Sequence, residues 1–159
     1  MAWYDNAVFY HIYPLGLCGC AHENDGQAVP GAFEKLNAWA KHAADLGCTA
    51  LYIGPLFESG SHGYDTIDYR LVDRRLGTNA EFRDFVARCH ARGQKVIVDG
   101  VFNHVGRDFF AFQDLKANRE NARYKDCLLY TSGRRAGPPA SAHRRGRPFR
   151  TCRSQSIYR

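Results

Sequence analysis

The residues best suited to chemistry gather in two short stretches. Residues 62–69 combine an aromatic ring, Tyr64, with carboxylates and a histidine, and residues 99–106 carry Asp99 and His104. Sugars need this mixture, because their C–H faces pack on flat rings and their hydroxyls require fixed polar partners. The two stretches therefore indicate a carbohydrate-binding site.

Asp99 directly follows an unbroken β-branched run, residues 96–98. A carboxylate at the rim of an apolar core must be paired or hydrogen-bonded to stay charged. Spacing alone leaves two interpretations open. Either Asp99 caps a neighbouring backbone or meets a buried Arg, or it belongs to a functional site.

Alternating strand and helix patterns must position these stretches. Apolar residues at three- and four-residue spacing predict one helix ending at Gly47 and another ending at Gly93. Thr78 and Glu81 have the spacing of a capping box at the start of the second helix. The run 96–98 is typical of a strand buried on both faces. The predicted strands cover residues 7–13, 49–53 and 96–98, and a long polar loop is predicted over residues 57–78.

This β-α-β-α-β order implies a right-handed parallel α/β sheet. Both a doubly wound sheet and a (β/α)8 barrel contain such an order, although no G-x-G-x-x-G opens the first helix. Ligands of parallel sheets bind beyond the carboxyl ends of the strands. We therefore expect residues 14–22, 57–69 and 99–106 to meet at one edge.

Charge divides the chain at residue 126. Residues 1–126 carry a net charge of −2, whereas residues 127–159 carry eight Arg and no acidic residue, for a net +8. Apolar periodicity also stops at Cys127, so we predict a non-globular basic tail over residues 127–159, disordered or artefactual. Nucleic-acid binding through this tail is an alternative function, but the acidic remainder offers nucleic acid no surface, so we expect no such partner.

The six cysteines do not form a disulfide framework, because the sequence opens without a secretory signal. No apolar run reaches the length of a membrane helix, so we expect a cytoplasmic protein without membrane contact. Cys18, Cys20 and His22 supply at most three zinc ligands, which favours a plain loop over a metal site.

Three motifs, in this order, resemble the start of the α-amylase family of glycoside hydrolases (family 13). The resemblance extends from about residue 7 to Asp126, which would form the first domain, 1–126. The motifs are Phe9-Tyr10-His11-Ile12-Tyr13-Pro14, His62-Gly63-Tyr64-Asp65-Thr66-Ile67-Asp68-Tyr69 and Asp99-Gly100-Val101-Phe102-Asn103-His104.

The resemblance implies roles for five residues. Tyr64 stacks on the glucose next to the scissile bond, His104 hydrogen-bonds a hydroxyl of that sugar, and Asp65 grips short oligosaccharides. Asp99 pairs with the Arg of the family's fourth strand and so organises the site. Asn103 matches a calcium ligand of many members, so a structural calcium is allowed, although no cofactor is required.

The resemblance further implies a (β/α)8 TIM barrel of which only the first three β/α units are present. The family's nucleophile and acid/base follow later strands, so the sequence contains no catalytic residue of its own. Retaining glycosidases need two carboxyls about 5–5.5 Å apart. We therefore expect a hydrolase of α-glucosidic bonds in maltodextrin- or starch-type oligosaccharides whose 159-residue chain is inactive alone. A non-catalytic sugar-binding module is the remaining alternative.

Overall fold

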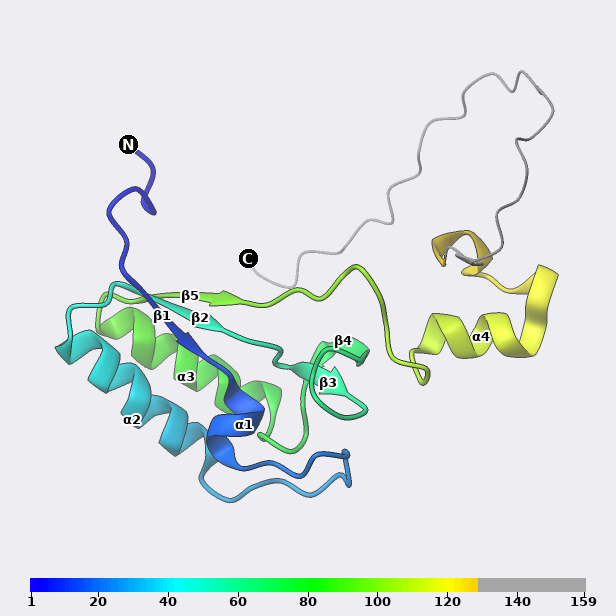
Figure 1. The fold of residues 1–159 in the computed structure, drawn as a ribbon, viewed down its shortest axis with the longest axis horizontal. Helices are drawn as coiled ribbons and strands as arrows, with labels where there is room; N and C mark the ends of the chain where they lie inside the picture. Colours follow the sequence, from blue (N-terminus) through cyan, green and yellow to red (C-terminus); the bar gives the residue numbers. More distant parts are fainter. Residues whose placement is uncertain (129–159) are drawn as a thin grey trace.

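The computed structural model describes residues 1–128, and a parallel sheet forms its centre (Figure 1). Its strands pair in the order β1-β2-β5, both pairings are parallel, and Ile12, Ile53 and Val98 lie level with one another. The predicted α/β class and parallel sheet are therefore confirmed. The three strands are β1 (Phe9–Ile12), β2 (Ala50–Ile53) and β5 (Lys95–Val98).

Two amphipathic helices, α2 (Ala32–Asp45) and α3 (Asn79–Ala91), cover one face of this sheet (Figure 1). Helix α3 begins with the predicted capping box. The Thr78 hydroxyl accepts from the Glu81 backbone N–H at 3.3 Å, and the Glu81 carboxylate accepts from the Thr78 N–H at 2.8 Å. Both helices are thus predicted correctly, and their apolar spacing explains which side faces the sheet.

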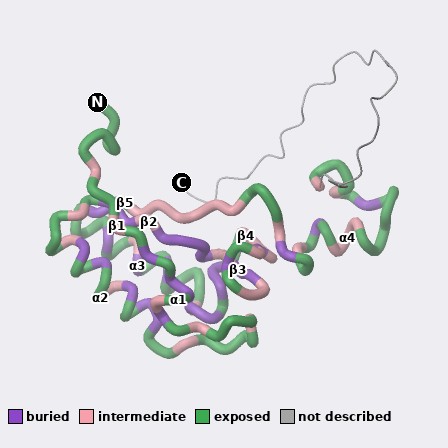
Figure 2. The backbone as a smooth tube through the Cα atoms, viewed as in Figure 1, coloured by how far each residue is buried: buried purple, intermediate pink, exposed green. Residues whose placement is uncertain are grey.

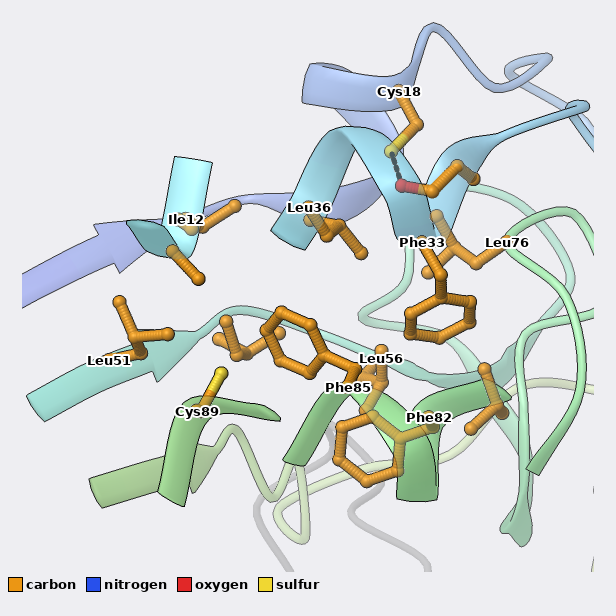
Figure 3. Packing of buried hydrophobic residues seen from close by; sticks show 14 of the residues in the cluster. Ile12, Cys18, Phe33, Leu36, Leu51, Leu56, Leu76, Phe82, Phe85 and Cys89 are labelled. Carbon is orange, nitrogen blue, oxygen red and sulfur yellow. Dashed lines mark hydrogen bonds between the residues drawn. The ribbon is translucent and has the colours of Figure 1, made fainter. Parts of the chain in front are cut away.

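The hydrophobic core lies between the sheet and these helices (Figure 3). Leu51, Leu36 and Phe85 come from β2, α2 and α3, and none exposes more than 1% of its surface. The ring of Phe33 packs 6.1 Å from that of Phe85. Each such side chain contributes about 1.5–3 kcal/mol by leaving water, so this layer holds the sheet in place.

The other face of the sheet is more open. Phe9 is 45% exposed, and Ile97, which alternates to the face away from the core, is only half-buried. Val96 and Val98 pack against the core but are also only half-buried, because β5 has no further strand beside it in the described residues (Figure 2). The prediction that residues 96–98 form a strand buried on both faces is wrong for the described structure. Within residues 1–128, β5 lies at an edge of the sheet, and helices cover one face only.

The stretches predicted as loops contain further elements. A five-residue helix follows the strand that Pro14 ends, and it ends in turn at Gly19 in the left-handed conformation. The predicted long loop over 57–78 holds an antiparallel hairpin whose register shifts twice, which hides the alternation of a regular strand. These elements are α1 (Pro14–Cys18), β3 (Phe57–Ser59), β4 (Thr66–Val72), α4 (Phe110–Asn118) and two short 3₁₀ turns, Arg119–Asn121 and Lys125–Cys127.

None of the helices in residues 1–128 is long and apolar enough to cross a membrane. The predicted basic tail, residues 127–159, lies outside the described residues apart from its first two. The prediction of a non-globular tail and the alternative of nucleic-acid binding through it therefore stay predictions.

Candidate functional site

Three chain segments meet beyond the carboxyl ends of the parallel strands, as predicted. The strand ladder continues past the strand ends: Gly54 N–H donates to the Ile12 carbonyl at 2.8 Å, and Asp99 N–H donates to the Ile53 carbonyl at 2.9 Å. The segment after β1 carries α1, the segment after β2 carries the β3–β4 hairpin, and the segment after β5 is the loop 99–106.

Asp99 is anchored to the strand next to it. Its backbone N–H donates to the Ile53 carbonyl of β2, and the ring of Tyr52, also on β2, stacks on His11 of β1 with centroids 4.8 Å apart. Burial raises the pKa of Tyr52, and the nearby charge of Asp99 raises it further. The first interpretation of Asp99, a backbone cap or a buried Arg partner, finds no such contact among residues 1–128, and the second, a place in a functional site, stays a prediction.

Tyr64 lies close enough to Tyr52 to act on it electrostatically. It is 44% exposed, its ring lies 6.0 Å from that of His62, and it helps to raise the pKa of Tyr52 after burial and Asp99 have done so. The preceding Gly63 has a φ of +92°, and a Cβ there would lie 2.7 Å from Pro55. Glycine is therefore required for the turn that presents the Tyr64 ring.

Asp65 points back into its own turn. Its carboxylate accepts hydrogen bonds from the Ser61 N–H at 3.2 Å and from the Ser61 hydroxyl at 2.9 Å, and His62 Nδ1 lies 3.8 Å away. Both carboxylate oxygens thus have a partner inside the turn. The grip on an oligosaccharide expected of Asp65 stays a prediction.

The loop 99–106 carries the remaining predicted residues, Asn103 and His104, and both are exposed. The loop contacts the hairpin, because Gly106 N–H donates to the Thr66 carbonyl at 2.8 Å. The described residues show Asp99 and Tyr64 around Tyr52, but give the His104 side chain no contact with either. Among residues 1–128, His104 therefore shares the loop 99–106 with Asp99, but its side chain does not contact Asp99 or Tyr64.

A buried ion pair beneath these loops was not predicted. Arg75 and Asp73 are 1% and 0% exposed in their side chains, and two Arg75 nitrogens donate to the Asp73 carboxylate at 2.8 Å each. Arg75 also donates to the carbonyls of Ala21, at 2.7 Å, and Ser61, at 2.6 Å. This pair ties the segment after β1 to the turn before Tyr64. In the sequence, the signal for this ion pair was the position of Asp73 two residues before Arg75.

A hollow of about 170 Å³ lies over this ion pair, between α1 and the hairpin. Tyr13 stands at its side and donates its hydroxyl to the His62 carbonyl at 2.9 Å. Tyr64, Asp99 and His104 are not among the residues that line it, so it is a neighbour of the predicted site and not its centre. The lining includes Tyr13, Cys20, His22, Ser61, His62 and Arg75.

Metal binding finds little support in this part of the chain. Residues 1–128 contain no group of three or more His, Cys, Asp or Glu side chains that could hold a metal ion. Calcium takes six to eight oxygen ligands, and Asn103 alone supplies one amide oxygen, so the calcium site stays a prediction. Cys18 instead hydrogen-bonds the Ala32 carbonyl, and Cys20 that of Arg75.

Comparison with protein families decides the relationship. Residues 12–150 match the family model described as the catalytic domain of alpha amylase. The chain belongs to the α-amylase family. The family match runs past residue 127, where the composition changes, so the domain boundary at 126/127 stays a prediction.

Curated relatives of this α-amylase-family chain are several times longer. A cyclomaltodextrinase from Geobacillus thermopakistaniensis is 44% identical over 139 residues, and neopullulanase 2 from Thermoactinomyces vulgaris is 38% identical over 147 residues. In each case the match covers 78% of this chain and 24% of the relative. The chain thus spans about a quarter of the length of these relatives.

Solved structures share the fold. The cyclic α-maltosyl-(1→6)-maltose hydrolase from Arthrobacter globiformis, in complex with maltose, aligns with a TM-score of 0.66 at 31% identity, over 89% of this chain and 34% of that chain. The acarbose-soaked debranching enzyme from Nostoc punctiforme aligns with a TM-score of 0.63 at 30% identity, over 77% of this chain and 30% of that chain.

Proposed function

We propose that this chain is the first part of the catalytic (β/α)8 barrel of a glycoside hydrolase that cleaves α-glucosidic bonds in maltodextrin-type oligosaccharides with retention. One observation supports the proposal: an exposed aromatic ring, Tyr64, and a strand-end carboxylate, Asp99, come from two segments that follow neighbouring parallel strands at the carboxyl edge of the sheet. The names of the relatives, which include cyclomaltodextrinase and maltogenic amylase, support the substrate class.

Each site residue has a proposed role in holding one glucose unit. Tyr64 stacks on the sugar face, and His104 donates to or accepts from a sugar hydroxyl. Asp99, whose backbone N–H is held by the Ile53 carbonyl, organises the polar floor of the site by pairing with a cation from a later strand. Asp65 shapes the turn that presents Tyr64 and contributes to the hold on short oligosaccharides, and Asn103 remains the proposed calcium ligand.

The catalytic carboxylates are proposed to lie outside these 159 residues. Asp65, Asp68 and Asp99 are not proposed to replace them, because the resemblance gives these residues roles in binding and support, whereas a retaining mechanism needs one carboxyl as nucleophile and a second, about 5–5.5 Å away, as proton donor. The chain alone is therefore expected to release no glucose from maltotriose. We also propose a cytoplasmic location, in line with the Bacillus subtilis relative named an intracellular maltogenic amylase.

A chimeric enzyme tests the proposal. Residues 1–126 replace the matching segment of the Geobacillus cyclomaltodextrinase, which shares 44% identity, and hydrolysis of maltotriose is measured. We expect an active chimera in which Tyr64→Ala lowers kcat/KM by about tenfold to a hundredfold, equivalent to about 1.4–2.7 kcal/mol of lost transition-state binding.

Tyr4→Ala is the matched control. Tyr4 is also exposed, at 59%, but it packs on Trp3 near the N-terminus, ahead of β1. It should change kcat/KM less than twofold, a small effect. A folded chimera that binds maltotriose but cleaves none of it would favour the sugar-binding module. Equal effects of the two substitutions would contradict the role of Tyr64.

A further inference from the structure

The loop 99–106 is fastened to the hairpin by the side chain of Tyr69, on β4. The Tyr69 hydroxyl donates to the Val101 carbonyl in a short hydrogen bond, and it lies 3.4 Å from the His104 carbonyl. These two carbonyls bracket Phe102 and Asn103. The single proton of this hydroxyl thus serves mainly the Val101 carbonyl, while the same oxygen lies against the carbonyl of the proposed sugar-binding histidine.

The Tyr69 ring cannot easily move away from this position. It contacts Phe57, Phe102 and Phe109, with centroid separations of 5.8, 5.3 and 5.9 Å. Burial raises the pKa of Tyr69, so the hydroxyl stays protonated and remains a donor at neutral pH. The three aromatic contacts therefore keep the Tyr69 hydroxyl directed at the loop 99–106.

A second fastening holds the far end of the loop. The Gly106 N–H donates to the Thr66 carbonyl at 2.8 Å, and a Cβ on Gly106 would lie 2.4 Å from the Asp65 carbonyl oxygen. No side chain fits there without moving the loop off the hairpin. The loop and the hairpin thus touch at two places, and only the first of them depends on a side chain.

We propose that Tyr69 is a positioning residue, whose hydroxyl fixes the backbone of Val101 and His104 and so sets where the His104 imidazole stands relative to bound sugar. The sugar-binding role of His104 rests on the proposed function. The fastening of the loop does not, because it is a contact within the chain.

Amide hydrogen exchange of the full 159-residue chain, followed by NMR, tests the proposal. Tyr69→Phe keeps the ring and its three aromatic contacts but removes the donor. We expect the amides of Phe102 and Gly106, which donate to the Gly100 and Thr66 carbonyls, to exchange about fivefold faster, as loss of one net hydrogen bond implies, and the His104 imidazole signal to shift. Amides of the core strand β2 should keep their rates, which separates positioning from general destabilisation.

Tyr13→Phe is the matched control, since it also removes a tyrosine hydroxyl bonded to a carbonyl, that of His62 at 2.9 Å. It should leave the exchange rates of the Phe102 and Gly106 amides unchanged. Gly106→Ala gives a second route to the same loop if Tyr69→Phe fails to fold, and it should expose the same amides with Tyr69 intact. Unchanged exchange and an unchanged His104 signal in folded Tyr69→Phe would overturn the proposal.

This experiment uses no sugar, so its outcome is independent of the chimera assay. An inactive chimera together with a loosened loop in Tyr69→Phe would contradict the proposed function and leave the fastening in place. An active chimera together with an unaffected loop in Tyr69→Phe would support the proposed function and contradict the fastening by Tyr69.

Discussion

The buried Arg75–Asp73 pair offers the most direct test of how the fold supports the site. Asp73→Asn keeps the size of the side chain but removes the charge that faces the Arg75 guanidinium. Asp73 also accepts from the Ser59 hydroxyl at 2.8 Å and from the Arg75 N–H at 3.1 Å. The substitution therefore leaves a buried cation without its anion and disturbs the turn around it.

The magnitude follows from burial. Both side chains are at most 1% exposed, and removal of one partner from a buried pair costs about 3–5 kcal/mol. Arg75 keeps its bonds to the carbonyls of Ala21 and Ser61, so we expect the lower end, about 3 kcal/mol. That loss lowers the ratio of folded to unfolded chain by more than a hundredfold.

Urea unfolding followed by circular dichroism measures this loss. The control is Lys41→Met, which breaks an exposed pair with Asp45, 67% and 59% exposed in its side chains and worth only about 0.3–0.5 kcal/mol. Asp73→Asn should shift the midpoint strongly, or unfold the chain before urea is added, whereas Lys41→Met should barely change it. Equal shifts in the two variants would refute the reasoning about the buried pair.

Three further predictions concern single side chains. Thr78→Ala removes the capping box of α3 and should lower the free energy of unfolding by about 1 kcal/mol, measured by urea titration, whereas Thr78→Ser should retain most of it. Burial raises the pKa of Cys18 to about 11, so the peptide that carries Cys18 should stay unlabelled by a thiol reagent at pH 8, as followed by mass spectrometry, until guanidinium unfolds the chain; rapid labelling of Cys18 itself in the folded chain would contradict this. Hydrogen bonds from Arg70 lower the pKa of Asp68 below 3.8, so Asp68 contributes stability above that pH and loses it as the pH falls through its folded value; Arg70→Gln should therefore reduce the loss of stability between pH 7 and pH 3, and an unchanged loss would show that the pair is unimportant.

The parallel sheet was predictable because its signals are local. Short β-branched runs such as 96–98 mark strands, and three- and four-residue apolar spacing marks α2 and α3. The capping box was equally readable, since Thr78 and Glu81 interact with each other three residues apart. Elements whose stability arises within the element itself are the ones that the sequence reveals.

The missed elements depend on contacts between distant segments. The β3–β4 hairpin has a shifted register and polar residues such as Asp68 and Glu58, which read as loop. Arg75 reads as a surface charge, although it is buried by partners from residues 21 and 61. The open side of β5 was missed for a similar reason, because burial of a strand depends on which segments cover it and not on its own composition.

The site was predictable as a set of loops, but its internal contacts were not. Residue types placed Tyr64, Asp99 and His104 at one edge of the sheet, and the structure brings the first two around Tyr52. The role of Tyr52 had no signal, because a tyrosine within a strand is typical of ordinary packing. The Tyr69 hydroxyl was hidden for the same reason.

We propose that Tyr64 and His104 hold one glucose unit at the carboxyl edge of this sheet. A crystal structure of the chimera with maltotriose measures this directly. We expect a glucose ring stacked on Tyr64 with one hydroxyl about 3 Å from the His104 imidazole. A bound sugar that touches neither residue, or a Tyr64 and a His104 that face separate spaces, would contradict it.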